Sequence, residues 1–189
     1  MRHRLKTIRA RSSCVMDFCC SAMRVSSKFN FFGVVPDDNA SWCECDNCAE
    51  ALAVSRQDTR GAGMFSNGAS SYYIFQFVNA VAKEGGKSHP DRYISALAYA
   101  SYAYPPLGLE LEPNVSVAPC LQICYGYVPD VFANDADLYR LWLDAGDRPI
   151  YLWNYFHHPL EPALIEGWKA FPSFMPEMIS QEVKQYARD

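Results

Sequence analysis

Long apolar segments are missing from this sequence of 189 residues. No run approaches the roughly 20 apolar residues that a membrane-spanning helix needs, so we expect a soluble chain with no membrane partner. Signatures of phosphate binding are also missing, because Gly61-Ala62-Gly63 lacks the later glycine and the preceding strand of a dinucleotide site. No nucleophile elbow occurs either. Nucleotide chemistry is therefore disfavoured.

Basic residues are scarce beyond residue 28. Residues 1–28 hold seven Lys or Arg and one Asp, whereas the rest of the chain holds ten Lys or Arg against twenty Asp or Glu. Nucleic acid is not expected as a partner, because phosphate binding needs a basic face on the folded part. The basic start lacks a continuous apolar stretch, so it is no conventional secretory signal. We interpret residues 1–28 as a poorly ordered segment, with an organelle transit peptide as the alternative.

Cysteine is too sparse for a small disulfide-stapled scaffold, at 8 of 189 residues. Three cysteines nonetheless crowd into a Trp-Cys-x-Cys-x-x-Cys motif that starts at Trp42, namely Cys43, Cys45 and Cys48. Three thiolates can hold a structural zinc ion when a fourth ligand joins them. The spacing differs from that of paired Cys-x-x-Cys modules, so disulfides and buried thiols stay open as alternatives.

A fourth ligand for such a metal is not evident beside the motif, and the candidates elsewhere are His89, His157 and Cys120. A metal bound by three thiolates would pin the surrounding loop rather than catalyse, because the thiolates neutralise the Lewis acidity that hydrolysis requires. No cofactor is therefore expected for catalysis, and zinc is expected only in a structural role.

Apolar periodicity predicts strands alternating with helices from residue 29 onwards. We expect strands over residues 29–35, 93–99, 115–121 and 150–155. Helices are expected from residue 70 or 71 to the glycines at 85–86, over a segment that ends at Gly146, and over 174–187. Between the first strand and the first helix, a long loop is expected to carry the cysteine motif.

This order of elements predicts an α/β fold with a largely parallel sheet, since parallel neighbours need crossover segments. A complete (β/α)8 barrel has eight strands and about 250 residues. Four strands therefore correspond to a partial (β/α)8 TIM-barrel-like domain over residues 29–189, roughly the C-terminal half of a barrel. Such a half-barrel would expose strand edges, through which we expect self-association.

Asp37 and Asp38 follow the first predicted strand, where barrel enzymes keep catalytic groups. A glycosidase needs two carboxyl groups, one to donate a proton and one to activate water or attack the sugar. We predict Asp37 and Asp38 as the catalytic residues. Adjacent residues in extended backbone reach one pocket only where the chain turns, so one catalytic acid beside one structural Asp is favoured over two catalytic acids. An Asx turn or a helix cap formed by these residues or by Asn39 is the structural alternative.

Tyrosine and tryptophan are abundant, at 12 and 4 residues, and offer stacking faces with polar tips that suit a carbohydrate cleft. We predict that the substrate-binding residues are Asn39, Trp42, Tyr99, Tyr102, Trp153, Tyr155 and His157. Because side chains alternate along a strand, about half of these rings should point into the core instead.

Five short motifs occur in order along the chain: Pro36-Asp37-Asp38-Asn39 with the cysteine motif behind it, the helical segment 73–82, Leu97-Ala98-Tyr99, Pro113-Asn114-Val115 and Trp153-Asn154-Tyr155. On these motifs the chain, over about residues 29–189, resembles the bacterial domain-of-unknown-function family 4838. Proteins of that family look like relatives of α-glucuronidases and often accompany polysaccharide-degrading enzymes. The resemblance implies a glycoside-hydrolase-like barrel and a carbohydrate partner.

The sequence therefore predicts a fragment of a glycoside hydrolase-like protein, an O-glycosyl hydrolase when the whole barrel is present, that acts on polysaccharide or oligosaccharide. Two alternatives stay open. One is a non-catalytic carbohydrate-binding or scaffold protein, which would keep the aromatic residues without needing the carboxylates. The other is an inactive truncated remnant.

Overall fold

The computed structural model describes residues 29–38, 41–156 and 175–189. Its centre is a sheet with the strand order β1-β2-β3-β4, formed by Phe31–Gly33, Tyr93–Ala98, Val115–Leu121 and Trp153–Asn154. All three strand pairings are parallel. The expected α/β class with a parallel sheet is confirmed, and the predicted N-terminal segment of residues 1–28 lies outside the described residues.

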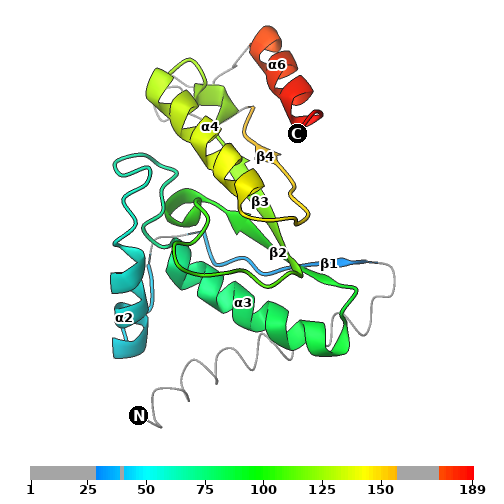
Figure 1. The fold of residues 1–189 in the computed structure, drawn as a ribbon. Coiled ribbons are helices and arrows are strands. Elements are labelled where there is room, and N and C mark those ends of the chain that lie inside the picture. The colour runs from blue at the N-terminus through cyan, green and yellow to red at the C-terminus, as the bar shows by residue number, and fades with distance from the viewer. Residues whose placement is uncertain (1–28, 39–40, 157–174) are drawn as a thin grey trace, which may run out of the picture.

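Helices cover one face of this sheet (Figure 1). Those described are α2 (Asp46–Ser55), α3 (Ser71–Ser88), α4 (Pro129–Asp144) and α6 (Pro176–Tyr186), with 3-10 turns η1 (Ala100–Tyr102) and η2 (Ile123–Tyr125). The core lies where α3 and α4 meet the sheet, and there the rings of Phe75 and Trp142 pack with centroids 5.2 Å apart. None of the helices in the described part of the chain is long and apolar enough to cross a lipid bilayer.

The two faces of β2 differ in burial, as the alternation of side chains along a strand requires. Ile94, Ala96 and Ala98 are buried against the helices, whereas the residues between them are only half-buried. The half-buried side is concave, because Phe31 of β1 and Tyr151 beside β4 bring their ring centroids within 5.1 Å although these segments belong to opposite edges of the sheet. The described sheet is therefore a curled, parallel half-barrel.

Strand β4 is shorter than the expected strand over 150–155, and Pro119 in β3 explains why. Val117 donates its N–H to the carbonyl of Pro149 and accepts a hydrogen bond from the N–H of Tyr151. In a parallel ladder the next donor on that edge is residue 119, where proline has no N–H. The pairing is interrupted there, and it resumes at Cys120 opposite Trp153.

Two helical predictions need correction. Helix α3 does not stop at Gly85 and Gly86 but runs to Ser88, because neither glycine takes the left-handed conformation that ends a helix. The expected loop around the cysteine motif contains α2, which begins at Asp46. Helix α2 buries only Leu52 and Ser55. Its sequence therefore lacks the apolar periodicity from which a helix is predicted.

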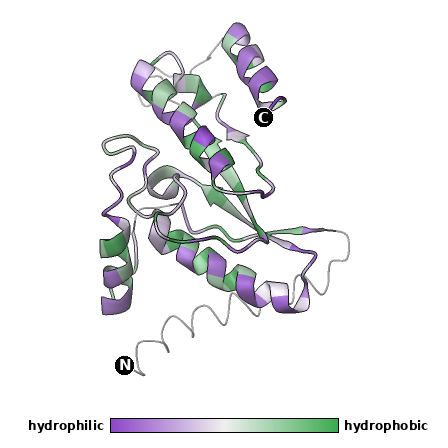
Figure 2. Cartoon of the chain, viewed as in Figure 1, coloured by the Kyte–Doolittle hydropathy of each residue, from purple (hydrophilic) through white to green (hydrophobic). Residues whose placement is uncertain are grey.

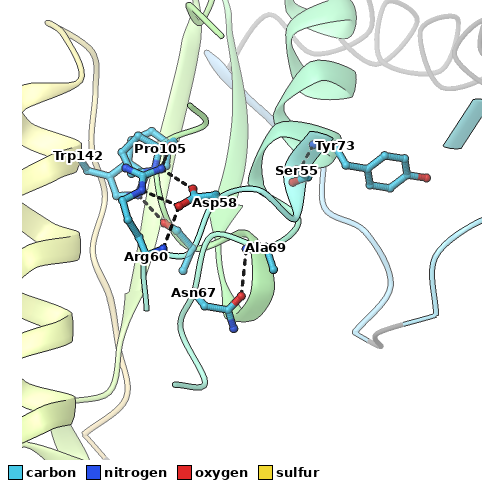
Figure 3. Close-up of polar contacts among 9 residues, drawn as sticks. Ser55, Asp58, Arg60, Asn67, Ala69, Tyr73, Pro105 and Trp142 are labelled. Carbon is cyan, nitrogen blue, oxygen red and sulfur yellow. Dashed lines mark hydrogen bonds and ion pairs between the residues drawn. The ribbon is translucent and has the colours of Figure 1, made fainter. Parts of the chain in front are cut away.

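The segment between α2 and α3 is fixed by a buried ion pair (Figure 3). Asp58 is 8% exposed and accepts hydrogen bonds from the backbone N–H of Arg60 at 3.0 Å and from its guanidinium at 2.9 and 2.6 Å. The same guanidinium donates to the carbonyl of Pro105 and lies 5.1 Å from the ring centre of Tyr104. The segment is thereby tied to the connection between β2 and β3.

Hydropathy follows this architecture (Figure 2). The sheet strands β2 and β3 are largely hydrophobic, while α6 is mostly hydrophilic and buries no residue completely. Met178, Ile179 and Tyr186 of α6 nevertheless pack against the core cluster. Helix α6 thus lies on the rest of the fold through a narrow apolar stripe.

Candidate functional site

The carboxyl ends of the parallel strands bring an acid and three tyrosines together. Asp38 follows β1, Tyr99 and Tyr102 follow β2, and Tyr155 follows β4. The hydroxyl of Tyr99 lies within hydrogen-bonding reach of the Asp38 carboxylate and of the Tyr155 hydroxyl. We call Asp38, Tyr99, Tyr102 and Tyr155 the tyrosine cluster. It occupies the edge of the sheet where barrel enzymes place their sites.

The rings of this cluster form a continuous aromatic surface with two neighbours. Tyr99 is 6.3 Å from Tyr102 and 6.4 Å from Tyr155 between ring centroids. Trp42 lies edge-on to Tyr102 at 6.3 Å, and Phe65 lies edge-on to Tyr99 at 5.4 Å. Tyr102 is only 5% exposed, so it supports its neighbours rather than presenting a face.

Burial raises the pKa of every tyrosine in the cluster. For Tyr99 burial is the largest cause, and the charge of Asp38 adds to it. The pKa of Tyr155 rises to about 12 through burial and through the neighbouring Tyr99. All three hydroxyls keep their protons at neutral pH, and that of Tyr99 is placed to donate a hydrogen bond to Asp38.

The backbone of the site is strained at Ala100. Its φ of 48° lies in the left-handed region, which costs a residue with a Cβ roughly 1–2 kcal/mol. The carbonyl of Ala100 accepts the N–H of Asn67 at 2.8 Å, and that of Ser101 accepts the N–H of Ser70 at 2.6 Å. These contacts hold the η1 turn that carries Tyr99 and Tyr102.

The predicted cysteine cluster is present in three dimensions. The sulfur atoms of Cys43, Cys45 and Cys48 all lie within 4.8 Å of one another, and those of Cys43 and Cys45 are 3.5 Å apart. The three thiols are free. Zinc–sulfur bonds of about 2.3 Å at tetrahedral angles separate ligand sulfurs by about 3.8 Å, so these thiols fit a tetrahedral metal after small adjustments.

Helix α2 supplies part of the electrostatics of this cluster. Cys45 is its N-cap, and backbone N–H groups of the first turn lower the pKa of the Cys45 thiol, chiefly through Cys48. Burial and the other thiols raise the pKa of Cys48 to about 11. Ionisation is therefore favoured at Cys45 and opposed at Cys48, and a bound cation would favour the thiolate form of both.

Of the fourth-ligand candidates that the sequence named, Cys120 and His89 do not join the three cysteines. Cys120 lies beside the tyrosine cluster, where it raises the pKa of Tyr102, and His89 caps the far end of α3. His157 lies outside the described residues. The hydroxyl that approaches the cysteines is that of Tyr73, within hydrogen-bonding reach of Cys48.

Trp42 connects the two clusters. It precedes Cys43 in the sequence, and its ring contacts Tyr73 beside the cysteines at 5.8 Å and Tyr102 of the tyrosine cluster at 6.3 Å. The N–H of Tyr73 also points to the hydroxyl of Ser55, 3.5 Å away at the end of α2 (Figure 3). The conformation of the cysteine segment therefore determines where the Trp42 ring lies.

Not every predicted site residue lies in the tyrosine cluster. Asp37 and Asp38 are both exposed, and of the two acids Asp38 is the one that lies beside Tyr99. Trp153 is 53% exposed on β4, and Asn39 lies outside the described residues. Phe65 was missed because it stands in a polar segment without a period. An isolated aromatic residue there was the one available signal.

Comparisons with known proteins identify a family but no characterised relative. Residues 10–188 match the model of a family described as Domain of unknown function (DUF4838). The match begins within residues 1–28, which the resemblance seen in the sequence had left out. No curated protein and no solved structure matches the chain.

Proposed function

We propose a carbohydrate-directed function for this chain, which belongs to the family described as Domain of unknown function (DUF4838). The chain would form part of a glycoside hydrolase-like protein, a partial (β/α)8 TIM-barrel-like domain that holds polysaccharide or oligosaccharide at the carboxyl edge of its sheet. The observation that carries the proposal is the contact of the Asp38 carboxylate with the Tyr99 hydroxyl inside an aromatic cluster.

The chemistry of the cluster supports a sugar ligand. Protonated phenols donate hydrogen bonds to sugar oxygens, and the partly exposed rings of Trp42, Phe65 and Tyr99 offer apolar faces for the C–H side of a sugar ring. Asp38 would act as one of the two carboxyl groups that glycosidic cleavage requires. Asp37 remains the proposed second carboxyl group, and it reaches the same bond only if the chain turns between them.

A non-catalytic carbohydrate-binding protein is the second candidate. Among the described residues, Asp38 is the one carboxylate placed against the aromatic cluster. A single carboxylate suffices to bind sugar hydroxyls but not for the usual two-carboxylate mechanism.

The cysteine cluster has a structural role in this proposal. A zinc ion held by Cys43, Cys45 and Cys48 would supply cross-linking rather than Lewis acidity. The spacing of the sulfurs and the adjacent Tyr73 support that assignment. Because Trp42 precedes the first of these ligands, the metal would fix one wall of the proposed sugar site.

The test compares Asp38→Asn with Asp37→Asn in the whole chain. Reducing-sugar release and calorimetric binding are measured on a panel of plant and bacterial polysaccharides. For a hydrolase, we expect Asp38→Asn to lower turnover at least about 100-fold with sugar affinity retained. For a binding protein, the unaltered chain shows affinity without turnover, and Phe65→Ala weakens it. An unaltered chain that neither binds nor cleaves any polysaccharide contradicts both candidates.

A further inference from the structure

A cavity lies away from the tyrosine cluster, between α4, α6 and the turn that follows β3. Its volume is about 140 Å³. Its walls are mostly apolar or aromatic, with Ile123 from η2, Phe132 and Tyr139 from α4, and Tyr186 from α6. The polar side chains in the lining are those of Asp135 from α4, Glu182 and Gln185 from α6, and Gln122.

Asp135 lines this cavity with a carboxyl group that is only partly hydrogen-bonded. The residue is 8% exposed. Its Oδ2 accepts the backbone N–H of Gln122 at 2.5 Å, whereas its Oδ1 is buried and has no hydrogen-bond partner among the described residues. When it is ionised, the carboxyl group therefore places a poorly compensated negative charge beside the cavity.

Glu182 adds a second negative charge from α6. Its Oε2 accepts the hydroxyl of Tyr186 at 2.7 Å, and its charge acts against ionisation of Asp135. Within residues 29–38, 41–156 and 175–189 no ion pair is formed by Asp135 or Glu182. The cavity therefore combines two carboxyl groups with apolar walls and holds no side-chain cation of its own from this part of the chain.

We propose that this cavity binds a primary alkylammonium ion, with the ammonium group attracted by the carboxyl groups of Asp135 and Glu182 and the alkyl chain lying against the aromatic rings of the lining. An apolar cavity of about 150 Å³ holds a molecule the size of benzene, so a chain of three to five carbons fits. The rings contribute further, because aromatic faces attract cations.

A hard metal ion suits this lining less well than an organic cation. Calcium takes six to eight oxygen ligands, and magnesium demands an octahedral shell with several retained waters. Two carboxyl groups and the amides of Gln122 and Gln185 offer few unoccupied oxygens, because one oxygen of each carboxyl group and that of Gln185 already accept hydrogen bonds. An alkylammonium ion instead needs one strong acceptor and apolar contact, and the cavity provides both.

The test titrates n-butylammonium chloride into the whole chain by calorimetry at about pH 8, where carboxyl groups with raised pKa are ionised. n-Butanol, which has the same alkyl chain without the charge, is titrated in parallel. Asp135→Asn removes the charge and keeps an oxygen for the N–H of Gln122. Asp137→Asn is the matched control, because Asp137 lies on the same helix with its side chain 64% exposed.

We expect saturable binding of n-butylammonium to the unaltered chain and to Asp137→Asn, and binding at least tenfold weaker to Asp135→Asn. n-Butanol should bind at least tenfold more weakly than the amine. The proposal is overturned if the unaltered chain shows no saturable heat, or if the alcohol binds as tightly as the amine. Unchanged affinity in a folded Asp135→Asn variant overturns it as well.

Discussion

Replacing Asp135 by Asn should make the protein's stability less sensitive to pH. Burial raises the pKa of this carboxyl from 3.8 to about 7, with the nearby Glu182 adding to the effect. Between these two values the folded state keeps a proton that the unfolded state has already released. Unfolding therefore becomes easier as pH rises through this window, and the loss is complete above the folded pKa.

The magnitude follows from the size of that shift. One pKa unit corresponds to 1.36 kcal/mol, so a shift of about 3 units withdraws about 4 kcal/mol of stability between about pH 4 and about pH 8. The substitution also has a cost that does not depend on pH, since the amide of Asn places an N–H group where Oδ1 was unpaired, at about 1–3 kcal/mol. Comparing the two pH values removes that constant cost.

Urea unfolding, followed by far-UV circular dichroism, measures both proteins at each pH. We expect the stability of Asp135→Asn relative to the unaltered chain to be up to about 4 kcal/mol more favourable at about pH 8 than at about pH 4. Glu182, Tyr139, Tyr186 and the Asp189 that bonds to Tyr139 face the same region and are present in both proteins. A difference that stays the same at both pH values refutes the reasoning.

The remaining predictions concern the ion pair and the cysteines. Asp58→Ala should lower the free energy of unfolding by about 3 kcal/mol, because it strands the guanidinium of Arg60 that is only 26% exposed. Gly68→Ala places a Cβ 2.2 Å from Asp58 Oδ2 and should lower the free energy of unfolding by about 1–3 kcal/mol. In the Asp58→Ala background the same substitution should lower it clearly less. Urea unfolding of the four proteins measures both effects, and equal effects in the two backgrounds contradict this packing. Cys45→Ser should abolish stoichiometric zinc in protein purified without chelator, measured by mass spectrometry, and chelation should lower the melting temperature of the unaltered chain alone. Metal-free protein with an unchanged melting temperature contradicts the zinc assignment.

The sequence predicts best where one local signal settles the structure. Strand β3 has the expected bounds, Val115–Leu121, because a continuous apolar run follows the Pro113-Asn114 turn. Strand β4 was expected to be longer, since its own residues carry a strand pattern. The interruption is caused by Pro119 in the neighbouring strand, and such a cause becomes visible only once the pairing is known.

The same distinction applies to the candidate site. Asp38, Tyr99 and Tyr155 could be placed together in advance, because the carboxyl ends of parallel strands meet at one edge. The sequence could not distinguish Tyr155, which joins the cluster, from Trp153, which is exposed two residues earlier. Nor could it reveal Asp135, which stands on a helix and becomes unusual only when α6 covers it.

The connection between β2 and β3 has a consequence for how the chain folds. This crossover contains no α-helix, and α3 holds it in place instead: Asn79 donates to the carbonyl of Glu110 at 2.7 Å and accepts the N–H of Glu112 at 2.9 Å. Because every described strand pair is parallel, none can form as a local hairpin. The entropy of closing each long connection is therefore lost before the strand hydrogen bonds form and stabilise the pair. We therefore expect docking of α3 onto this crossover to align β2 with β3 and to limit the rate of folding.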